Sequence, residues 1–288
     1  MTPSVGDRLK AVGTATVRDA LEGATDAITA SGSPSPRLDA ELLLAEATGI
    51  ERVRLASEPE ASLPPGSGRE FAGMVRRRVL REPVAYILGR KGFRMIDVRV
   101  DPRVLVPRPE SELLVEFALE AGPTSVLDVG TGSGAVALAI ADELPGATVL
   151  ATDTSPGAVA SARANAERLG LADRVEVIEA GYPAGRGPFD LVVANLPYVT
   201  QAEWEGLEPD IREHEPREAL VAGPGGLEAI EALVGRIGDS GRLPQAIALE
   251  VGAGQASVVA ELVASSGFAS VESRRDLAGI ERVVTGRA

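Results

Sequence analysis

Apolar residues recur at helical spacing through the first part of the chain. The apolar positions from Val17 to Ile28 would share one face of a helix, and a second helix is expected after Ser35-Pro36-Arg37. A third helix is expected from Arg69 to Val79, after a loop rich in proline, glycine and serine. Because no strand pattern occurs here, the sequence predicts a small all-helical domain over residues 1–90.

The pattern changes to alternation in the next segment. Apolar residues at roughly alternate positions from Phe93 to Val106, interrupted at Asp101-Pro102-Arg103, predict a β-hairpin. We expect this hairpin to form a linker over residues 91–108 that bridges the helical domain and a larger domain over residues 109–288.

Beyond the hairpin, strand-like apolar runs alternate with helical stretches, and a terminal β pair closes the chain. This alternation predicts the α/β class, with a mostly parallel, doubly wound sheet that has helices on both faces. The expected strands are Ser125–Val129, Thr148–Thr152, Val175–Glu179, Phe189–Ala194, Gln245–Val251, Ser270–Asp276 and Arg282–Val284, and the expected helices are Ala135–Glu143, Pro156–Leu169, Gly226–Gly235 and Gln255–Ser266.

Composition excludes several kinds of site. The chain has no cysteine and one histidine, which excludes disulfides, thiolate metal sites and multi-histidine zinc sites, so we expect no metal. Its start has no signal-like apolar segment, and no apolar run reaches about eighteen residues, so we expect a cytoplasmic protein without membrane association. A formal net charge of −13 argues against a broad basic surface for nucleic acid. We further expect a monomer.

Three glycines follow the first predicted strand of the sheet. Gly130, Gly132 and Gly134 occupy alternate positions between that strand and a helix, where glycine permits a tight turn and close approach of a ligand. The spacing is neither GxGxxG nor a P-loop, so a nicotinamide dehydrogenase and a nucleotidase are disfavoured. An ordinary glycine-rich turn is the alternative.

An acid, Asp153, ends the second predicted strand of the sheet. Because the carboxyl ends of neighbouring parallel strands meet at one edge, this carboxylate is expected beside the glycine loop, where it can accept both hydroxyl hydrogens of a ribose. The competing interpretation is a helix N-cap before Thr154-Ser155-Pro156. A ribose-binding acid beside a loop without phosphate-binding chemistry indicates S-adenosylmethionine.

The segment Asn195-Leu196-Pro197-Tyr198 follows another buried strand and is expected at the same edge of the sheet. The Asn195 side-chain oxygen and a backbone carbonyl constrained by the proline present two acceptors that suit an NH2 group, and they orient its lone pair toward a methyl donor. Tyr198 can form an aromatic wall. The alternative is a proline turn in which the asparagine bonds its own backbone.

This segment resembles the Asn-Pro-Pro-Tyr motif of amino-directed methyltransferases, and the loop from Asp128 to Gly134 resembles their cofactor loop. An ordered series of further segments is similar to the PrmC/HemK family, whose members methylate the glutamine side-chain amide in the Gly-Gly-Gln loop of class-1 peptide-chain release factors. These segments are Ser35–Leu43, Arg81–Gly89, Val106–Glu112, Glu215-Pro216, Ala219-Leu220, Gly225–Leu227, Arg275–Leu277 and Glu281-Arg282.

The resemblance implies a Rossmann-like class I methyltransferase domain, S-adenosylmethionine as cofactor with S-adenosylhomocysteine as product, and a release factor as protein partner, held with the help of the helical domain. Two positions depart from the family pattern: Leu196 replaces the first proline, and Gly181 stands where many relatives have an acid near the adenine. The implied cofactor residues are Gly130, Thr131, Gly132, Ser133, Gly134, Asp153, Tyr182 (packing on adenine) and Asn195, and the implied catalytic and substrate-binding residues are Asn195, Leu196, Pro197 and Tyr198.

Three other functions remain open on the sequence alone. The same turn could grip the amine of adenine in a nucleic acid, although the negative charge argues against that substrate. A binding protein without turnover and an enzyme redirected to another protein or small-molecule amide are the others.

Several charged residues can be interpreted either as structural or as functional. Glu110 and Glu112 could favour the sulfonium charge or act as first-turn acids of a helix. The run Arg76-Arg77-Arg78 is expected to form a polar helix face, with partner docking as the alternative, and His214 is expected in a solvated loop.

Overall fold

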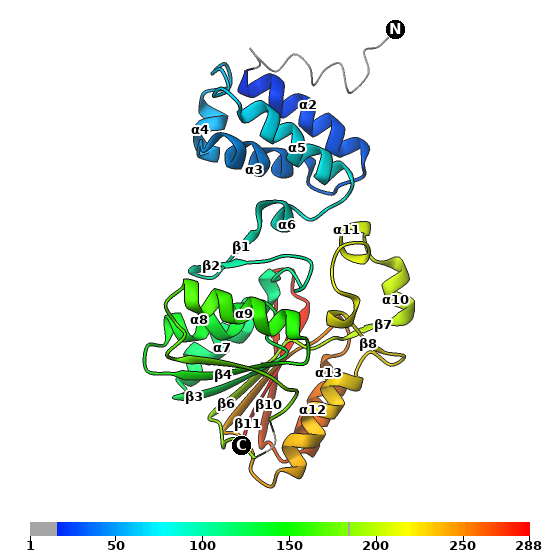
Figure 1. Ribbon diagram of the computed structural model, residues 1–288. Coiled ribbons are helices and arrows are strands. Elements are labelled where there is room, and N and C mark those ends of the chain that lie inside the picture. The colour runs from blue at the N-terminus through cyan, green and yellow to red at the C-terminus, as the bar shows by residue number, and fades with distance from the viewer. Residues whose placement is uncertain (1–15, 184) are drawn as a thin grey trace. The chain divides into compact units, whose positions relative to one another are not determined.

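The computed structural model describes residues 16–183 and 185–288, which form two compact units (Figure 1). One unit holds the described residues 16–89 together with Pro209–His214, and the other holds Arg90–Glu208 and Glu215–Ala288. The sequence pattern did not predict that the short segment 209–214 would belong to the helical unit.

The first unit is a bundle of helices around an apolar core. The Thr16 side chain accepts from the backbone N–H of Asp19 and so caps α2 (Val17–Ala30), while Gly49 ends α3 (Pro36–Thr48) with a φ of +67°. Leu21, Ile28 and Leu43 are buried between the helices. The helices of this unit are α2 (Val17–Ala30), α3 (Pro36–Thr48), α4 (Arg52–Ser57), α5 (Ser67–Val79), α6 (Val84–Leu88) and α11 (Pro209–Arg212).

A buried ion cluster lies inside this unit. Arg78 of α5 is 2% exposed and contacts Asp39 and Asp210, each with N···O of 2.7 Å. The expectation of a polar face therefore holds for Arg76 and Arg77, which are exposed, and is wrong for Arg78. Its side chain is turned inward because two carboxylates compensate the buried charge.

The second unit is built on a seven-stranded sheet. Its strand order is β10-β11-β9-β6-β3-β4-β5, in which β9, β6, β3, β4 and β5 are parallel and β11 is antiparallel to both neighbours. The strands are β3 (Ser125–Val129), β4 (Thr148–Asp153), β5 (Val175–Glu179), β6 (Leu191–Ala194), β9 (Ala246–Glu250), β10 (Ser270–Arg275) and β11 (Glu281–Arg287). The predicted α/β class with a mostly parallel sheet is confirmed.

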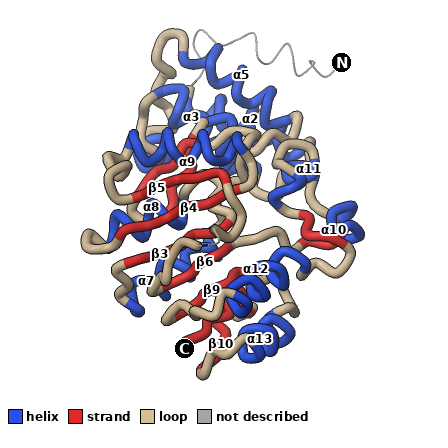
Figure 2. The backbone as a smooth tube through the Cα atoms, turned by 60° about the horizontal axis from the view of Figure 1, so that its bottom comes forward, coloured by secondary structure: helices blue, strands red, loops and turns tan. Residues whose placement is uncertain are grey.

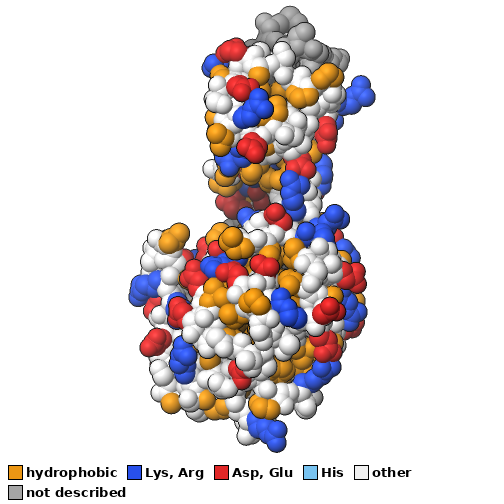
Figure 3. All heavy atoms as spheres, turned by 90° about the vertical axis from the view of Figure 1, so that its left-hand side faces the viewer, with side chains coloured by type: hydrophobic (Ala, Val, Ile, Leu, Met, Phe, Trp, Pro, Cys, Tyr) orange, Lys and Arg blue, Asp and Glu red, His pale blue; other side chains and the backbone are white. Residues whose placement is uncertain are grey.

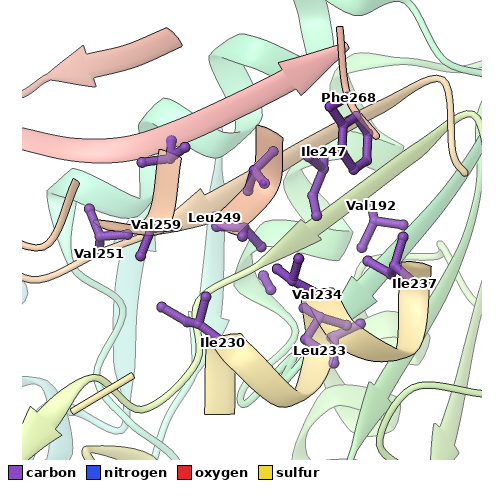
Figure 4. Packing of buried hydrophobic residues seen from close by; sticks show 14 of the residues in the cluster. Val192, Ile230, Leu233, Val234, Ile237, Ile247, Leu249, Val251, Val259 and Phe268 are labelled. Carbon is purple, nitrogen blue, oxygen red and sulfur yellow. The ribbon is translucent and has the colours of Figure 1, made fainter. Parts of the chain in front are cut away.

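Helices cover both faces of this sheet (Figures 1 and 2). The long helices are α7 (Glu112–Ala121), α8 (Ala135–Glu143) and α9 (Pro156–Arg168) on one face, and α12 (Glu228–Asp239) and α13 (Ala256–Ser265) on the other. Figure 4 shows Ile230 and Val234 of α12 directed at Val192 and Leu249 of the strands, all of them essentially unexposed. This packing makes the sheet a rigid support for the loops at its edge.

Smaller elements lie around the sheet. A hairpin is formed by β1 and β2, and a short parallel pair by β7 and β8. The remaining elements are β1 (Arg90–Phe93), β2 (Ile96–Arg99), the 3-10 turns η1 (Pro109–Ser111) and η2 (Arg217–Ala219), β7 (Val199–Thr200), α10 (Gln201–Gly206) and β8 (Val221–Gly223).

The hairpin prediction was wrong in its extent. Both strands lie within residues 90–99, with the reversal at Arg94, whose φ is +51°, and Met95. The apolar positions Val104 and Val106 are buried without being part of a strand. Alternation reports burial on one side of the chain, and a loop packed on the core gives the same signal as a strand.

Candidate active site

The strand order reverses direction between β3 and β6, which are hydrogen-bonded neighbours with Val129 opposite Ala194. At such a switch point the loops that follow the two strands diverge and leave a crevice at the carboxyl edge. A cavity of about 220 Å³ opens there. Among its lining residues are Gly130, Thr131, Gly132, Ser133, Asp153, Gly181, Asn195, Leu196 and Pro197.

Backbone hydrogen bonds attach the glycine loop to the end of β4. Gly130 and Thr131 both donate from their backbone N–H to the Thr152 carbonyl, at 2.8 and 2.9 Å. Gly130 has a φ of +76°, and a Cβ there would lie 2.9 Å from Leu196 Cδ2. Glycine is therefore required at this position both by the backbone conformation and by the close approach of the turn after β6.

Asp153 ends β4 and faces the glycine loop. Its Oδ2 accepts the backbone N–H of Gly132 at 2.9 Å, and its Oδ1 accepts that of Ser155 at 2.9 Å. Ser155 is the N-cap of α9, since its hydroxyl accepts from Ala158 N. The capping interpretation of Asp153 is thus wrong, and its carboxylate, held by two backbone donors, lines the cavity.

A second acid of this region, Asp128 in β3, is 2% exposed and also lines the cavity. The Thr131 hydroxyl donates to Asp128 Oδ2 at 2.7 Å. Burial raises the pKa of Asp128 to about 7, while the hydrogen bond from Thr131 opposes that shift and the negative charge of Asp153 adds to it. The hydrogen bond between Thr131 and Asp128 attaches the glycine loop to β3.

The turn after β6 is held by a chain of side chains. Asn195 Nδ2 donates to Ser111 Oγ at 3.0 Å, and Ser111 Oγ donates to Glu250 Oε2 at 2.6 Å. The Tyr198 hydroxyl donates to Glu250 Oε1 at 3.3 Å. Burial of Tyr198, together with the neighbouring Glu250 carboxylate, raises the pKa of the phenol.

The backbone of this turn has its own anchor. Gln255 Nε2, at the start of α13, donates to the Tyr198 carbonyl at 3.0 Å, and Gln255 Oε1 accepts from Gly252 N at 2.8 Å. The turn continues directly into β7, which pairs with β8. Tyr198 therefore supports the turn from behind and is not among the residues that line the cavity, unlike the aromatic wall expected from the sequence.

The sequence did not identify Ser111, Glu250 or Gln255 as site residues. A signal was present for Glu250, since it is a charged residue that ends an otherwise apolar strand beside β6, at the same edge as the cavity. A carboxyl in such a position is buried and needs donors.

Tyr182 does not line this cavity. It packs against the apolar core beside Phe189 and lines a separate hollow of about 420 Å³ with Arg236 and Arg242. Gly134 also lies outside the cavity lining: a Cβ there would lie 3.2 Å from Ala162 Cβ, so this glycine serves the packing of α8 on α9.

The other conspicuous residues also lie outside the cavity lining. Glu112 is a first-turn acid of α7 and accepts the backbone N–H of Arg94 at 3.2 Å, and Glu110 lies in η1. His214 is half-buried in the first unit, with Nε2 3.2 Å from the Leu80 carbonyl oxygen. Within residues 16–183 and 185–288 no group of acids and histidines is arranged to hold a metal ion, and no helix is long and apolar enough to cross a membrane.

The fold is one that solved methyltransferase structures share. The chain superposes on the hMettl16 catalytic domain, solved in complex with an MAT2A 3′UTR hairpin, with a TM-score of 0.58 at 16% identity over 73% of this chain and 81% of that chain. A methyltransferase from Pyrococcus furiosus gives a TM-score of 0.50 at 21% identity over 67% and 88%. These likenesses establish the fold.

The family follows from the sequence comparisons. The model of the PrmC N-terminal domain matches residues 19–89, and that of ribosomal protein L11 methyltransferase (PrmA) matches residues 113–201. Release factor glutamine methyltransferase of Geobacter sulfurreducens is 40% identical over 94% of this chain and 96% of its own length. The Rhodopirellula baltica enzyme of the same name is 41% identical over 94% and 95%. The chain therefore belongs to the release factor glutamine methyltransferase family, and its methyl donor is S-adenosylmethionine.

Proposed function

We propose that this protein transfers a methyl group from S-adenosylmethionine to the side-chain amide nitrogen of the glutamine in the Gly-Gly-Gln loop of class-1 peptide-chain release factors. The observation that carries the proposal is that Asn195 and the glycine loop line one cavity, in a chain about 40% identical over 94% of its length to release factor glutamine methyltransferases.

The chemistry of the turn suits an amide nitrogen. Its lone pair is delocalised into the carbonyl, so it is a poor nucleophile unless its two hydrogens are gripped and its geometry is fixed. The Asn195 side-chain oxygen and the Leu196 carbonyl are the two acceptors proposed for this role. They also favour the positive charge that grows on nitrogen as the methyl group arrives. The proton is lost after transfer, so the proposal needs no general base.

The glycine loop and Asp153 fit the cofactor. S-adenosylmethionine supplies the methyl group from a positively charged sulfonium. The Asp153 carboxylate is held by two backbone N–H groups and retains acceptor capacity for ribose hydroxyls. The cradle at Gly130 has no room for a side chain. We propose that Gly130 to Ser133 line the methionine and ribose part, and that backbone groups near Gly181 meet the adenine in place of the Tyr182 ring.

The adenine-N6 nucleic-acid alternative has less support. Such a substrate requires a basic tract that follows phosphates, whereas the chain carries a formal net charge of −13. On the face drawn in Figure 3, Lys and Arg side chains are interspersed with Asp and Glu. The hMettl16 domain shares the fold at 16% identity, which carries no information about substrate.

The proposal is tested by incubating the protein with cofactor labelled in its methyl group and a purified class-1 release factor. A second reaction uses the same release factor with alanine in place of the Gly-Gly-Gln glutamine. We expect label on the first factor and none on the second. Equal labelling of both factors, or none on either, would contradict the proposal.

A further inference from the structure

The amide of Asn195 is joined to a carboxylate by one intervening hydroxyl. Nδ2 of Asn195 lies 3.0 Å from Ser111 Oγ, which lies 2.6 Å from Glu250 Oε2. Ser111 is 3% exposed and Glu250 is 1% exposed. Ser111 also lines the cavity, and its hydroxyl has the Asn195 amide and the Glu250 carboxylate as hydrogen-bond partners. Its single proton can serve one acceptor at a time.

The charge of Glu250 decides where that proton goes. An ionised carboxylate only accepts hydrogen bonds, so it takes the hydrogen of Ser111. The Ser111 oxygen then has lone pairs alone to offer Asn195, which must present its NH2 group to Ser111 and turn its carbonyl oxygen the other way. Without the carboxylate, Ser111 could donate to the Asn195 oxygen, and the amide could rotate by half a turn.

We propose that Glu250, acting through Ser111, is a positioning residue that fixes which end of the Asn195 amide faces the target nitrogen. The inference rests on the proposed function, because the oxygen end of the amide suits a substrate that offers N–H hydrogens and the NH2 end does not. With the oxygen turned toward the cavity, Asn195 accepts a hydrogen from the substrate NH2. With the NH2 turned toward it, two donors would face each other.

The environment of Glu250 makes the orientation of the Asn195 amide sensitive to pH. Burial raises the pKa of Glu250 to about 7, while the hydrogen bonds from Ser111 and Tyr198 oppose the shift. The nearby Glu110 charge raises the pKa further, and the Arg282 charge lowers it. We therefore expect the fixed orientation to weaken, and methylation to slow, as the pH falls through about 7.

The chain offers a direct test, since it contains two asparagines, Asn165 and Asn195. Protein labelled with ¹⁵N at asparagine gives two side-chain NH2 signals in a proton–nitrogen correlation spectrum. Asn165 Nδ2 donates to the backbone carbonyls of Arg99 and Ser133, so its signal is an internal control for the fold. We expect the Asn195 signal to titrate near pH 7 in the unmodified protein while the Asn165 signal stays fixed. An Asn195 signal that does not move between pH 5 and pH 9 would overturn the inference.

Two variants extend the test to catalysis. Glu250→Gln has nearly the same shape but can donate to Ser111, so it should abolish the titration of the Asn195 signal and lower kcat about tenfold or more, the effect of one lost hydrogen bond. Ser111→Ala should act in the same direction. The matched controls are the exposed Glu261→Gln and Ser257→Ala on α13. Full kcat in Glu250→Gln, with the Asn165 signal unchanged, would contradict the role of Glu250.

A third readout separates positioning from general damage. A release factor with glutamate in place of the Gly-Gly-Gln glutamine presents acceptors, so Glu250→Gln should bind it better, relative to the glutamine form, than the unmodified protein does. An unchanged ratio would contradict the inference. Because the NMR titration involves no substrate, its outcome is independent of whether a release factor is methylated at all.

Discussion

A single side chain, that of Asn195, carries the chemical selectivity of the proposed site. Its amide has one end that accepts hydrogen bonds and one that donates them, and Ser111 takes the donating end. The remaining oxygen is one of two acceptors assigned to the target NH2. The residue is therefore expected to act on the methyl-transfer step and not on cofactor binding.

Replacing Asn195 with alanine tests that assignment. Asn195→Ala should lower kcat by about 10²- to 10³-fold, the usual cost of removing one preorganised group that stabilises a transition state. The dissociation constant of S-adenosylhomocysteine, measured by calorimetry, should change little, because the glycine loop and Asp153 are untouched. A variant that lost cofactor affinity in proportion to its rate would instead assign Asn195 to the cofactor.

Replacing Asp153 is expected to weaken cofactor binding, whereas replacing Asn195 is expected to slow methyl transfer. Asp153→Ala removes a charge-assisted acceptor for the ribose hydroxyls, each such bond being worth about 1.5–3 kcal/mol, so the KM for S-adenosylmethionine should rise at least about tenfold. Asp173→Ala, which removes an exposed acid from the turn before β5, is the matched control. Indistinguishable KM values for the two variants would rule out the ribose role.

For single residues, the sequence predicted the side chains that line the cavity better than the side chains that hold them in position. Asn195 and Asp153 follow apolar strands, and the geometry of parallel sheets brings strand ends together. The partner Ser111 lies 84 residues from Asn195, and Glu250 lies 139 residues from Ser111. Periodicity carries no information on contacts at such separations, so these two positioning residues emerged from the structure.

Two adjacent strands, β3 and β6, set the geometry of the site. Each ends in a loop at the carboxyl edge, and the loops approach so closely that a Cβ added at Gly130 would lie 2.9 Å from Leu196 Cδ2 and 3.4 Å from the Asn195 carbonyl oxygen. The separation of the proposed cofactor and substrate positions is thus fixed by the spacing of two strands in a buried sheet.

A methyl group at Gly130 should disturb this arrangement. Gly130→Ala imposes a side chain at a φ of +76° and 2.9 Å from Leu196 Cδ2, so we expect a loss of about 1–2 kcal/mol in the free energy of unfolding and a rise in the cofactor KM. Gly235→Ala in α12 adds the same methyl group with nothing within 4 Å, and should stabilise by about 0.5–1 kcal/mol. Urea unfolding compares the two, and changes of the same sign would contradict the account.

The ion cluster between helices α3, α5 and α11 allows a test within the helical unit. Arg78→Met leaves Asp39 buried with hydroxyl donors but without its counter-charge, so the unfolding free energy should fall by about 3–5 kcal/mol. Arg54→Met breaks the exposed pair with Glu58 and should cost less than about 1 kcal/mol. Thermal unfolding followed by circular dichroism distinguishes them, and equal losses would show that the buried Arg78 contributes no more to stability than an exposed ion pair does.

Helix and strand prediction succeeded where an element buries one face over several turns or residues, as in α9 and β9. It failed for the hairpin, because Val104 and Val106 continue the alternation of β2 although their segment is a loop packed on the core. The inward turn of Arg78 was missed for a related reason, since its partner Asp210 is contributed by a distant segment of the chain.

For the molecule as a whole, alternation of strands and helices was sufficient to predict the α/β class, and the order of short motifs was sufficient to indicate the family. The assignment of residues 209–214 to the helical unit could not be predicted, because it depends on ion pairs of Asp210 with Arg78 and Arg81. This segment follows the Asn195 turn and α10 in the chain, so a short stretch of sequence leads from the proposed substrate turn into the helical unit.

We propose above that the protein methylates a glutamine side chain of a release factor in the cavity between the glycine loop and Asn195. Mass spectrometry of a class-1 release factor, after incubation with the protein and S-adenosylmethionine, tests it most directly. We expect the added mass of one methyl group, located by fragmentation on the side-chain nitrogen of the Gly-Gly-Gln glutamine. A release factor that remains unmodified, or a methyl group at any other position, would contradict it.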